Sequence, residues 1–114
     1  MIKMQPDMES VYTENSGNIA GTIDKQFIFT PPEMFDMAKM FAKITLKPGS
    51  MIKEHAHTDD AEVYYLLQGE AVVTDGGVQR VLRAGDAVFT GHGNTHSIGN
   101  KTGEDVVFLA VILK

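Results

Sequence analysis

Three histidines and one glutamate carry the most specific chemical signal in this chain of 114 residues. His55 and His57 are separated by one residue, Glu62 follows five positions later, and His96 lies in a second segment framed by glycines. Side chains two positions apart on a β-strand point to the same face, so the spacing predicts that the first two imidazoles enter one space. Imidazole and carboxylate groups together suit a divalent transition-metal ion. The pattern therefore predicts a metal site built from these four side chains.

The ligand types narrow the choice of metal without fixing it. Imidazole suits the later transition metals and a carboxylate keeps manganese accessible, so we favour Mn or Fe, and Ni, Co and Zn stay open. On an ion that prefers six ligands, four protein ligands leave positions for water or substrate. A tetrahedral ion such as zinc would be nearly saturated.

Short strands are the elements that must position these residues. Between Ala38 and Lys47 apolar and polar residues alternate, which predicts a half-buried strand. Asp75-Gly76-Gly77 predicts a hairpin turn, because glycine accepts positive φ. Further strands are expected at residues 26–30, 53–57, 63–67, 71–74, 78–82, 87–90, 96–98 and 106–113. This succession of strands and turns predicts an all-β sandwich or barrel.

The chain is expected to form a single domain. Residues 1–36 would be an N-terminal arm with the first strands, and residues 37–114 would form the barrel that contains the candidate ligands. The first two dozen residues are polar and contain glycine, so we expect an irregular arm with one short strand. Such arms fray unless they are tied down, so this arm is expected to add a strand to a partner subunit.

Composition excludes several classes of protein. A formal charge of −5 and a pI near 5.2 argue against a nucleic-acid partner, which would need clustered basic residues. The absence of cysteine excludes disulfides and thiolate metal sites. No apolar run reaches the length of a membrane span or a signal-peptide core, so we expect a cytoplasmic protein with no membrane partner.

The glycine, histidine and glutamate spacings resemble the two motifs of the cupin family. The first motif is matched by Gly49, five residues, His55-x-His57, four residues, Glu62, six residues and Gly69. The second is matched by Gly85, five residues, Gly91-x-Gly93, two residues, His96, three residues and Asn100. The one departure is Gly91, where the family usually has proline. That proline shapes a turn and binds no metal.

The resemblance implies a double-stranded β-helix, or jelly-roll barrel, with a metal ion in its mouth. In the family the metal ligands match His55, His57, Glu62 and His96, and small single-domain members commonly form homodimers. The short segment between the motifs is similar to compact microbial cupins described as mannose-6-phosphate-isomerase-like or oxalate-binding. The family is chemically broad, so the fold alone does not determine a reaction.

Three further residues are candidates for catalysis, each with a simpler interpretation that we prefer. Tyr64 lies two positions after Glu62, so on a strand both side chains would face the same side. Tyr64 could donate its hydroxyl to a substrate there, but a core aromatic is the more common role. Lys53 lies two positions before His55, so on a strand it would face the same side and could pair with an anion. A solvated lysine is the more common role. His92 could shuttle protons, but an exposed turn histidine is preferred. The catalytic residues therefore stay unknown.

Two functions remain open at this point. One is a metal-dependent enzyme, an oxidoreductase or isomerase, acting on a small polar or carboxylate-bearing substrate by dioxygenase, oxalate-related or isomerase chemistry. The other is a non-catalytic module that binds or senses a small ligand.

Bicupin oxalate decarboxylases carry an arginine three residues before the first histidine ligand, where this chain has Ile52. The scarcity of basic residues in the motifs counts against a phosphorylated substrate. We lean towards the enzyme.

Overall fold

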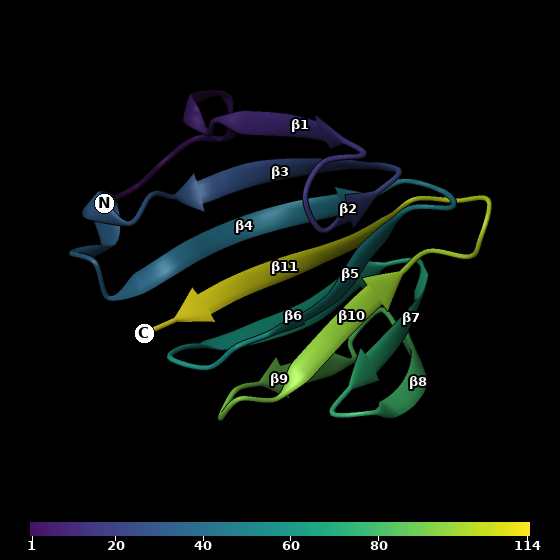
Figure 1. Ribbon diagram of the computed structural model, residues 1–114. Helices are drawn as coiled ribbons and strands as arrows, with labels where there is room; N and C mark the ends of the chain where they lie inside the picture. The colour runs from purple at the N-terminus through teal and green to yellow at the C-terminus, as the bar shows by residue number, and fades with distance from the viewer.

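Two antiparallel sheets make up the protein, as shown by a computed structural model that describes residues 1–114 (Figure 1). One sheet has six strands in the order β1-β3-β4-β11-β6-β9, and the other has five in the order β2-β5-β10-β7-β8. The strands are β1 Ser10–Glu14, β2 Ile19–Ala20, β3 Thr22–Phe29, β4 Ala38–Leu46, β5 Met51–Ala56, β6 Ala61–Gln68, β7 Glu70–Asp75, β8 Val78–Arg83, β9 Ala87–Thr90, β10 Thr95–Gly99 and β11 Val106–Leu113. The all-β prediction is confirmed.

The core lies between the two sheets and follows from the alternation of side chains. On β4 every second residue from Ala42 to Leu46 is buried, and the intervening lysine and threonine are only partly buried. β11 continues this layer with Phe108. The five-stranded sheet closes the core with Val73 and Ile98, which are both at most 1% exposed. The hairpin also forms as predicted, because Asp75 pairs with Val78 across Gly76 and Gly77, both at positive φ.

The N-terminal segment is more ordered than the sequence predicts. In place of an irregular arm with one short strand, it contains β1, β2 and the beginning of β3. β1 pairs with β3 of the same chain, from Ser10 opposite Gln26 to Glu14 opposite Thr22. β1 lies at the edge of its sheet and buries none of its residues, so it lacks the apolar alternation that marks a strand in sequence. The addition of the arm to a partner subunit stays a prediction.

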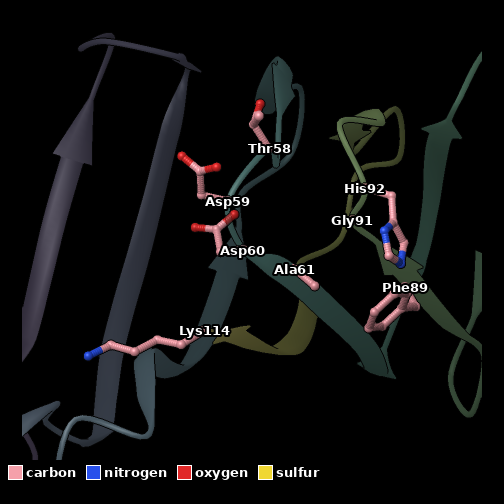
Figure 2. A pocket seen from close by; sticks show the side chains of 8 residues that line it. All are labelled: Thr58, Asp59, Asp60, Ala61, Phe89, Gly91, His92 and Lys114. Carbon is pink, nitrogen blue, oxygen red and sulfur yellow. The ribbon is translucent and has the colours of Figure 1, made fainter.

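Two loops at one end of the sheets are bonded to each other and fix the entry to β10 (Figure 2). The backbone N–H of His57 donates to the carbonyl of Asn94 at 3.1 Å, and that of Gly93 donates to the carbonyl of His57 at 2.9 Å. At Gly91, where the resemblance predicts proline, an added Cβ would lie 3.0 Å from the Cβ of Ala61. Glycine therefore lets the turn lie close to the start of β6.

The only helical segments are two three-residue 3-10 turns, η1 Gln5–Asp7 and η2 Pro32–Met34. The second lies between β3 and β4. The structure contains no helix with the length and apolar character needed to cross a membrane.

Gly69 marks the crossing from one sheet to the other, and its replacement gives a test of the fold. Gly69 and Gly77 both have φ of +84°, so alanine at either position costs about 1 kcal/mol in backbone strain. Only at Gly69 would the new Cβ meet another group, the carbonyl oxygen of Asp105 at 2.6 Å. We expect Gly69→Ala to lower the free energy of unfolding by at least about 1 kcal/mol more than Gly77→Ala, measured by chemical denaturation. Equal losses would contradict this account of the crossing.

Candidate metal centre

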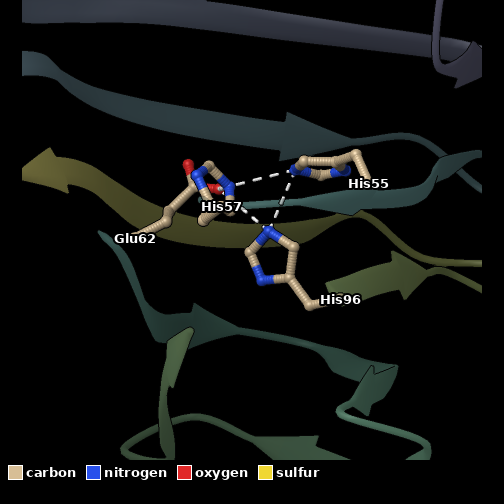
Figure 3. A group of neighbouring side chains, drawn as sticks. All are labelled: His55, His57, Glu62 and His96. Carbon is tan, nitrogen blue, oxygen red and sulfur yellow. Dashed lines mark hydrogen bonds and ion pairs between the residues drawn. The ribbon is translucent and has the colours of Figure 1, made fainter. Parts of the chain in front are cut away.

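Four side chains from three strands and one loop converge between the two sheets (Figure 3). His55 lies on β5, His57 directly follows that strand, Glu62 lies on β6, and His96 lies on β10. One potential ligand atom from each side chain lies within 4.8 Å of all the others. The structure thus brings together the four residues that the spacing singles out.

A bulge in β5 sets which of its side chains face inward. His96 of β10 pairs with His55, and Ile98 pairs with Ile52, so two steps on β10 match three steps on β5. The extra residue lets both Ile52 and His55 face the interior. It also interrupts the alternation of side chains that would have placed Lys53 on the same face as His55. Lys53 is exposed, which agrees with its preferred interpretation as a solvated lysine.

The distances within the cluster are short enough for its side chains to bind one metal ion. Oε1 of Glu62 lies 3.0 Å from Nε2 of His57, 3.0 Å from Nε2 of His96 and 3.8 Å from Nε2 of His55. Nε2 of His96 lies 3.0 Å from Nε2 of His55. Metal–ligand bonds of about 2.1 Å separate neighbouring ligand atoms by about 3.0 to 3.4 Å. The donor set therefore fits one ion.

The electrostatics of the cluster keep the carboxylate charged. Burial raises the pKa of the Glu62 carboxyl, but the imidazoles of His55, His96 and His57 outweigh it and lower that pKa to about 2. The pKa of His55 is raised, chiefly by its interaction with Glu62, whereas burial and the charge of Lys25 act to lower it. An ionised, 3% exposed carboxylate faces three imidazoles, and this arrangement favours a cation among them.

Two of the imidazoles are oriented by hydrogen bonds on the side away from the cluster. Nδ1 of His57 donates to Oδ1 of Asp60 at 2.7 Å, and Nδ1 of His55 donates to the carbonyl oxygen of Lys53 at 2.8 Å. A carboxylate and a carbonyl oxygen can only accept hydrogen bonds, so Nδ1 carries the proton in each ring. The lone pair on Nε2 is therefore free to bind a metal ion. Asp60 is itself held by Lys39 at 3.1 Å. Sequence reasoning missed this role of Asp60. A carboxylate three positions after a candidate ligand was the available signal.

His96 is held by stacking rather than by a second hydrogen bond. Its ring lies 4.7 Å from that of Tyr64 at an interplanar angle of 11°, and its Nδ1 is buried without a partner in the chain. Tyr64 in turn packs edge-on against Phe108 of the core. The Tyr64 hydroxyl lies 3.3 Å from Nε2 of His96, and burial followed by the charge of Glu62 raises its pKa well above the usual value. Tyr64 is a core aromatic, as preferred, but one that also supports a ligand.

His92 lies outside this arrangement. It is exposed at the turn between β9 and β10, with φ of +57°. It borders an outer pocket of about 290 Å³ with Asp59, Phe89 and Lys114 (Figure 2). It does not line the cavity that contains the cluster. The preferred interpretation, an exposed turn histidine, agrees with this position.

Three residues of the cluster, His55, His57 and Glu62, line a small cavity of about 190 Å³, whereas His96 is fully buried behind them. This is below the range of about 300 to 1,000 Å³ that holds drug-sized ligands, so the cavity suits a ligand of few atoms. Its walls are mostly apolar, and two further polar residues, Asn18 and Lys25, line it. Sequence reasoning missed both, because they lie at least 30 positions before His55 and no local pattern connects them to it.

Comparison with known proteins agrees with the fold and the cluster. A family model described as "Cupin domain" matches residues 42–112, which is more than half of the chain. The chain belongs to the cupin family. It is 39% identical over 93 residues to the "Oxalate-binding protein" of Thermotoga maritima, and the match covers 82% of this chain and 77% of that protein.

Solved cupin structures superpose closely on this one. A crystal structure of a predicted oxalate decarboxylase from Thermotoga maritima has a TM-score of 0.92 at 34% identity, and the match covers 99% of this chain and 98% of that one. A cupin 2 conserved barrel domain protein from Rhodopseudomonas palustris has a TM-score of 0.78 at 16% identity, with 94% of this chain and 72% of that chain covered. At that identity the second match shows the fold alone.

The bond between His57 and Asp60 makes Asp60 a positioning residue that can be tested. Asp60→Asn removes the charged acceptor while keeping the size of the side chain, so we expect metal affinity to fall by about 10- to 100-fold. The matched control is Asp59→Asn, because Asp59 is exposed and adjacent. Competition with a chelating dye measures the affinity of each variant for Mn²⁺ and Zn²⁺. Equal affinities in the two variants would contradict the orienting role.

Proposed function

We propose that this cupin binds a small carboxylate, with oxalate as the first candidate, through a divalent metal ion held by His55, His57, Glu62 and His96. The observation that carries the proposal is the convergence of three imidazoles and one ionised carboxylate, of which His55, His57 and Glu62 line a cavity of about 190 Å³. The Thermotoga maritima relative that is described as oxalate-binding supports the choice of ligand.

Mn or Fe remains our choice of metal, because three imidazoles and one carboxylate suit both ions. When bound, the metal supplies a Lewis-acid centre with open positions for carboxylate oxygens. The chain supplies the rest. Ile19, Ile44, Ile52 and Ile112 line the cavity and limit the size of the ligand that can enter.

Between the two functions left open by the sequence, the cavity favours binding. Tyr64 lines the cavity but its hydroxyl lies against Nε2 of His96 at 3.3 Å, and Lys53 and His92 both lie on the outside. No arginine lines the cavity, and Ile52 occupies the position where bicupin oxalate decarboxylases carry one. Decarboxylation is the second candidate, because the Thermotoga maritima structure that superposes with a TM-score of 0.92 is described as a predicted oxalate decarboxylase.

Calorimetric titration of oxalate into Mn²⁺-loaded and metal-free protein tests the proposal. We expect binding of about one oxalate per chain in the loaded protein and none in the metal-free protein, because the metal provides the carboxylate site. His96→Ala, prepared with the same Mn²⁺ treatment, should lose oxalate binding. Oxalate binding that is absent, or equal with and without metal, would contradict the proposal. Release of formate and CO₂ from bound oxalate would favour the decarboxylase instead.

We also propose that the protein forms a homodimer through the outer face of the six-stranded sheet. β11 is apolar on both faces, and its outward residues continue across neighbouring strands. Cross-strand pairs form one apolar row over five strands: Phe29, Phe41, Val111, Val63 and Phe89. A neutral row of this kind can face its own copy about a two-fold axis, as isologous dimers require.

Tyr65 lies beside this row, is 43% exposed, and pairs with Leu109 of β11. Tyr65→Glu places a charge on the proposed interface and should convert a dimer into a monomer of 12.5 kDa. Val78→Glu is the matched control, because Val78 is 60% exposed on β8 of the other sheet. Light scattering during size exclusion measures the mass. A monomeric parent, or a Tyr65→Glu variant that stays dimeric, would contradict the proposed interface.

A further inference from the structure

The cavity beside the metal cluster contains one lysine and no arginine, and that lysine is Lys25. It lies on β3 between Ile23, which is 0% exposed, and Phe27, which packs against the core. Side chains two positions apart on a strand share a face, so Lys25 belongs to the inward row of β3. It pairs across the sheet with Ile44 of β4, which lines the same cavity.

Lys25 makes no direct ion pair with a carboxylate. Lys3, Lys39 and Lys47 each form an ion pair, with Glu33, Asp60 and Asp105, whereas Lys25 forms none. A lysine that served only solubility would lie on the outer face, as Lys43 does on β4. An inward cation among isoleucines gains most when an anion is brought to it.

We propose that Lys25 is the anion-recognition residue of the cavity and makes the site select a small dicarboxylate over a monocarboxylate. This inference rests on the proposed function, and it names the part of that function that the metal ligands do not supply. Lys25 receives the carboxylate oxygens that face away from the four ligands.

The charges in the cavity support a doubly negative ligand. Glu62 contributes one negative charge and Lys25 one positive charge, so these two side chains cancel. A divalent ion then leaves an excess of two positive charges in a space with mostly apolar walls. A monocarboxylate would neutralise half of that excess, and a dicarboxylate would neutralise all of it. Uncompensated charge is costly where water is scarce, so the second carboxylate adds affinity.

Asn18 completes the polar side of the cavity. Its carbonyl oxygen accepts a hydrogen bond from the backbone N–H of Lys53 at 2.7 Å, which ties the loop before β2 to β5. This bond fixes the backbone of Asn18, which also lines the cavity. Asn18 and Lys25 therefore border the same cavity, and an amide N–H and an ammonium are both donors that suit carboxylate oxygens.

The test compares Lys25→Met with Lys43→Met in the full chain loaded with Mn²⁺. Lys43 is the matched control, because it lies in the same sheet on the opposite face, paired with Gln26 next to Lys25. Calorimetry measures the affinity for oxalate and for glycolate, which has two carbons but a single carboxylate. We expect Lys25→Met to lower oxalate affinity at least about tenfold, with a smaller loss for glycolate, so that the preference for oxalate shrinks. Lys43→Met should behave like the parent.

Metal affinity gives a second readout that separates recognition from a structural role. Removal of a positive charge beside the cluster should leave Mn²⁺ affinity unchanged or increase it. Loss of Mn²⁺ affinity in Lys25→Met would overturn the assignment, because it would make Lys25 a support of the cluster. Equal oxalate preference in Lys25→Met and Lys43→Met would also overturn it, while the proposed function would stand. Absence of oxalate binding in the loaded parent would instead overturn the proposed function itself.

Discussion

A buried carboxylate opposite three imidazoles is the interaction on which the rest of this structure depends. Glu62 is 3% exposed, and a charged group at that depth is costly unless it is paired. Its partners come from β5, from the loop after it and from β10, all of which belong to or adjoin the five-stranded sheet, whereas Glu62 belongs to the six-stranded sheet. The cluster therefore ties the two sheets together at one end, where apolar packing gives way to polar contacts.

The same contacts link the core of the protein to the cavity. Phe108 packs on Tyr64, and Tyr64 stacks on His96, so an imidazole of the cluster rests directly on the hydrophobic core. On the other side, Asp60 and the bulge of β5 orient two further imidazoles through their Nδ1 atoms. A site held by packing on one face and hydrogen bonds on the other is preorganised for a ligand.

The sequence predicts the cluster because three of its residues are close in the chain and the fourth, His96, lies in a second glycine-framed segment whose spacing resembles the family's second motif. The alternation in β4 and the hairpin at Asp75 depend on local pattern alone and were confirmed. The features that the sequence did not reveal have a common physical origin in non-local pairing. The strands of the N-terminal arm are stabilised by partners rather than by their own pattern, and the bulge that turns Lys53 outward arises from the register between β5 and β10. Lys25 reaches the cavity only because β3 pairs with β4.

The central claim is that these four side chains hold one metal ion. The most direct test is the metal content of untagged protein after reconstitution with Mn²⁺ and desalting, beside His55→Ala treated in the same way. The account predicts about one equivalent of manganese per chain in the parent and a small fraction of that in the variant. Equal metal content in the two proteins, or no bound metal in the parent after treatment with Mn, Fe, Co, Ni and Zn in turn, would contradict it.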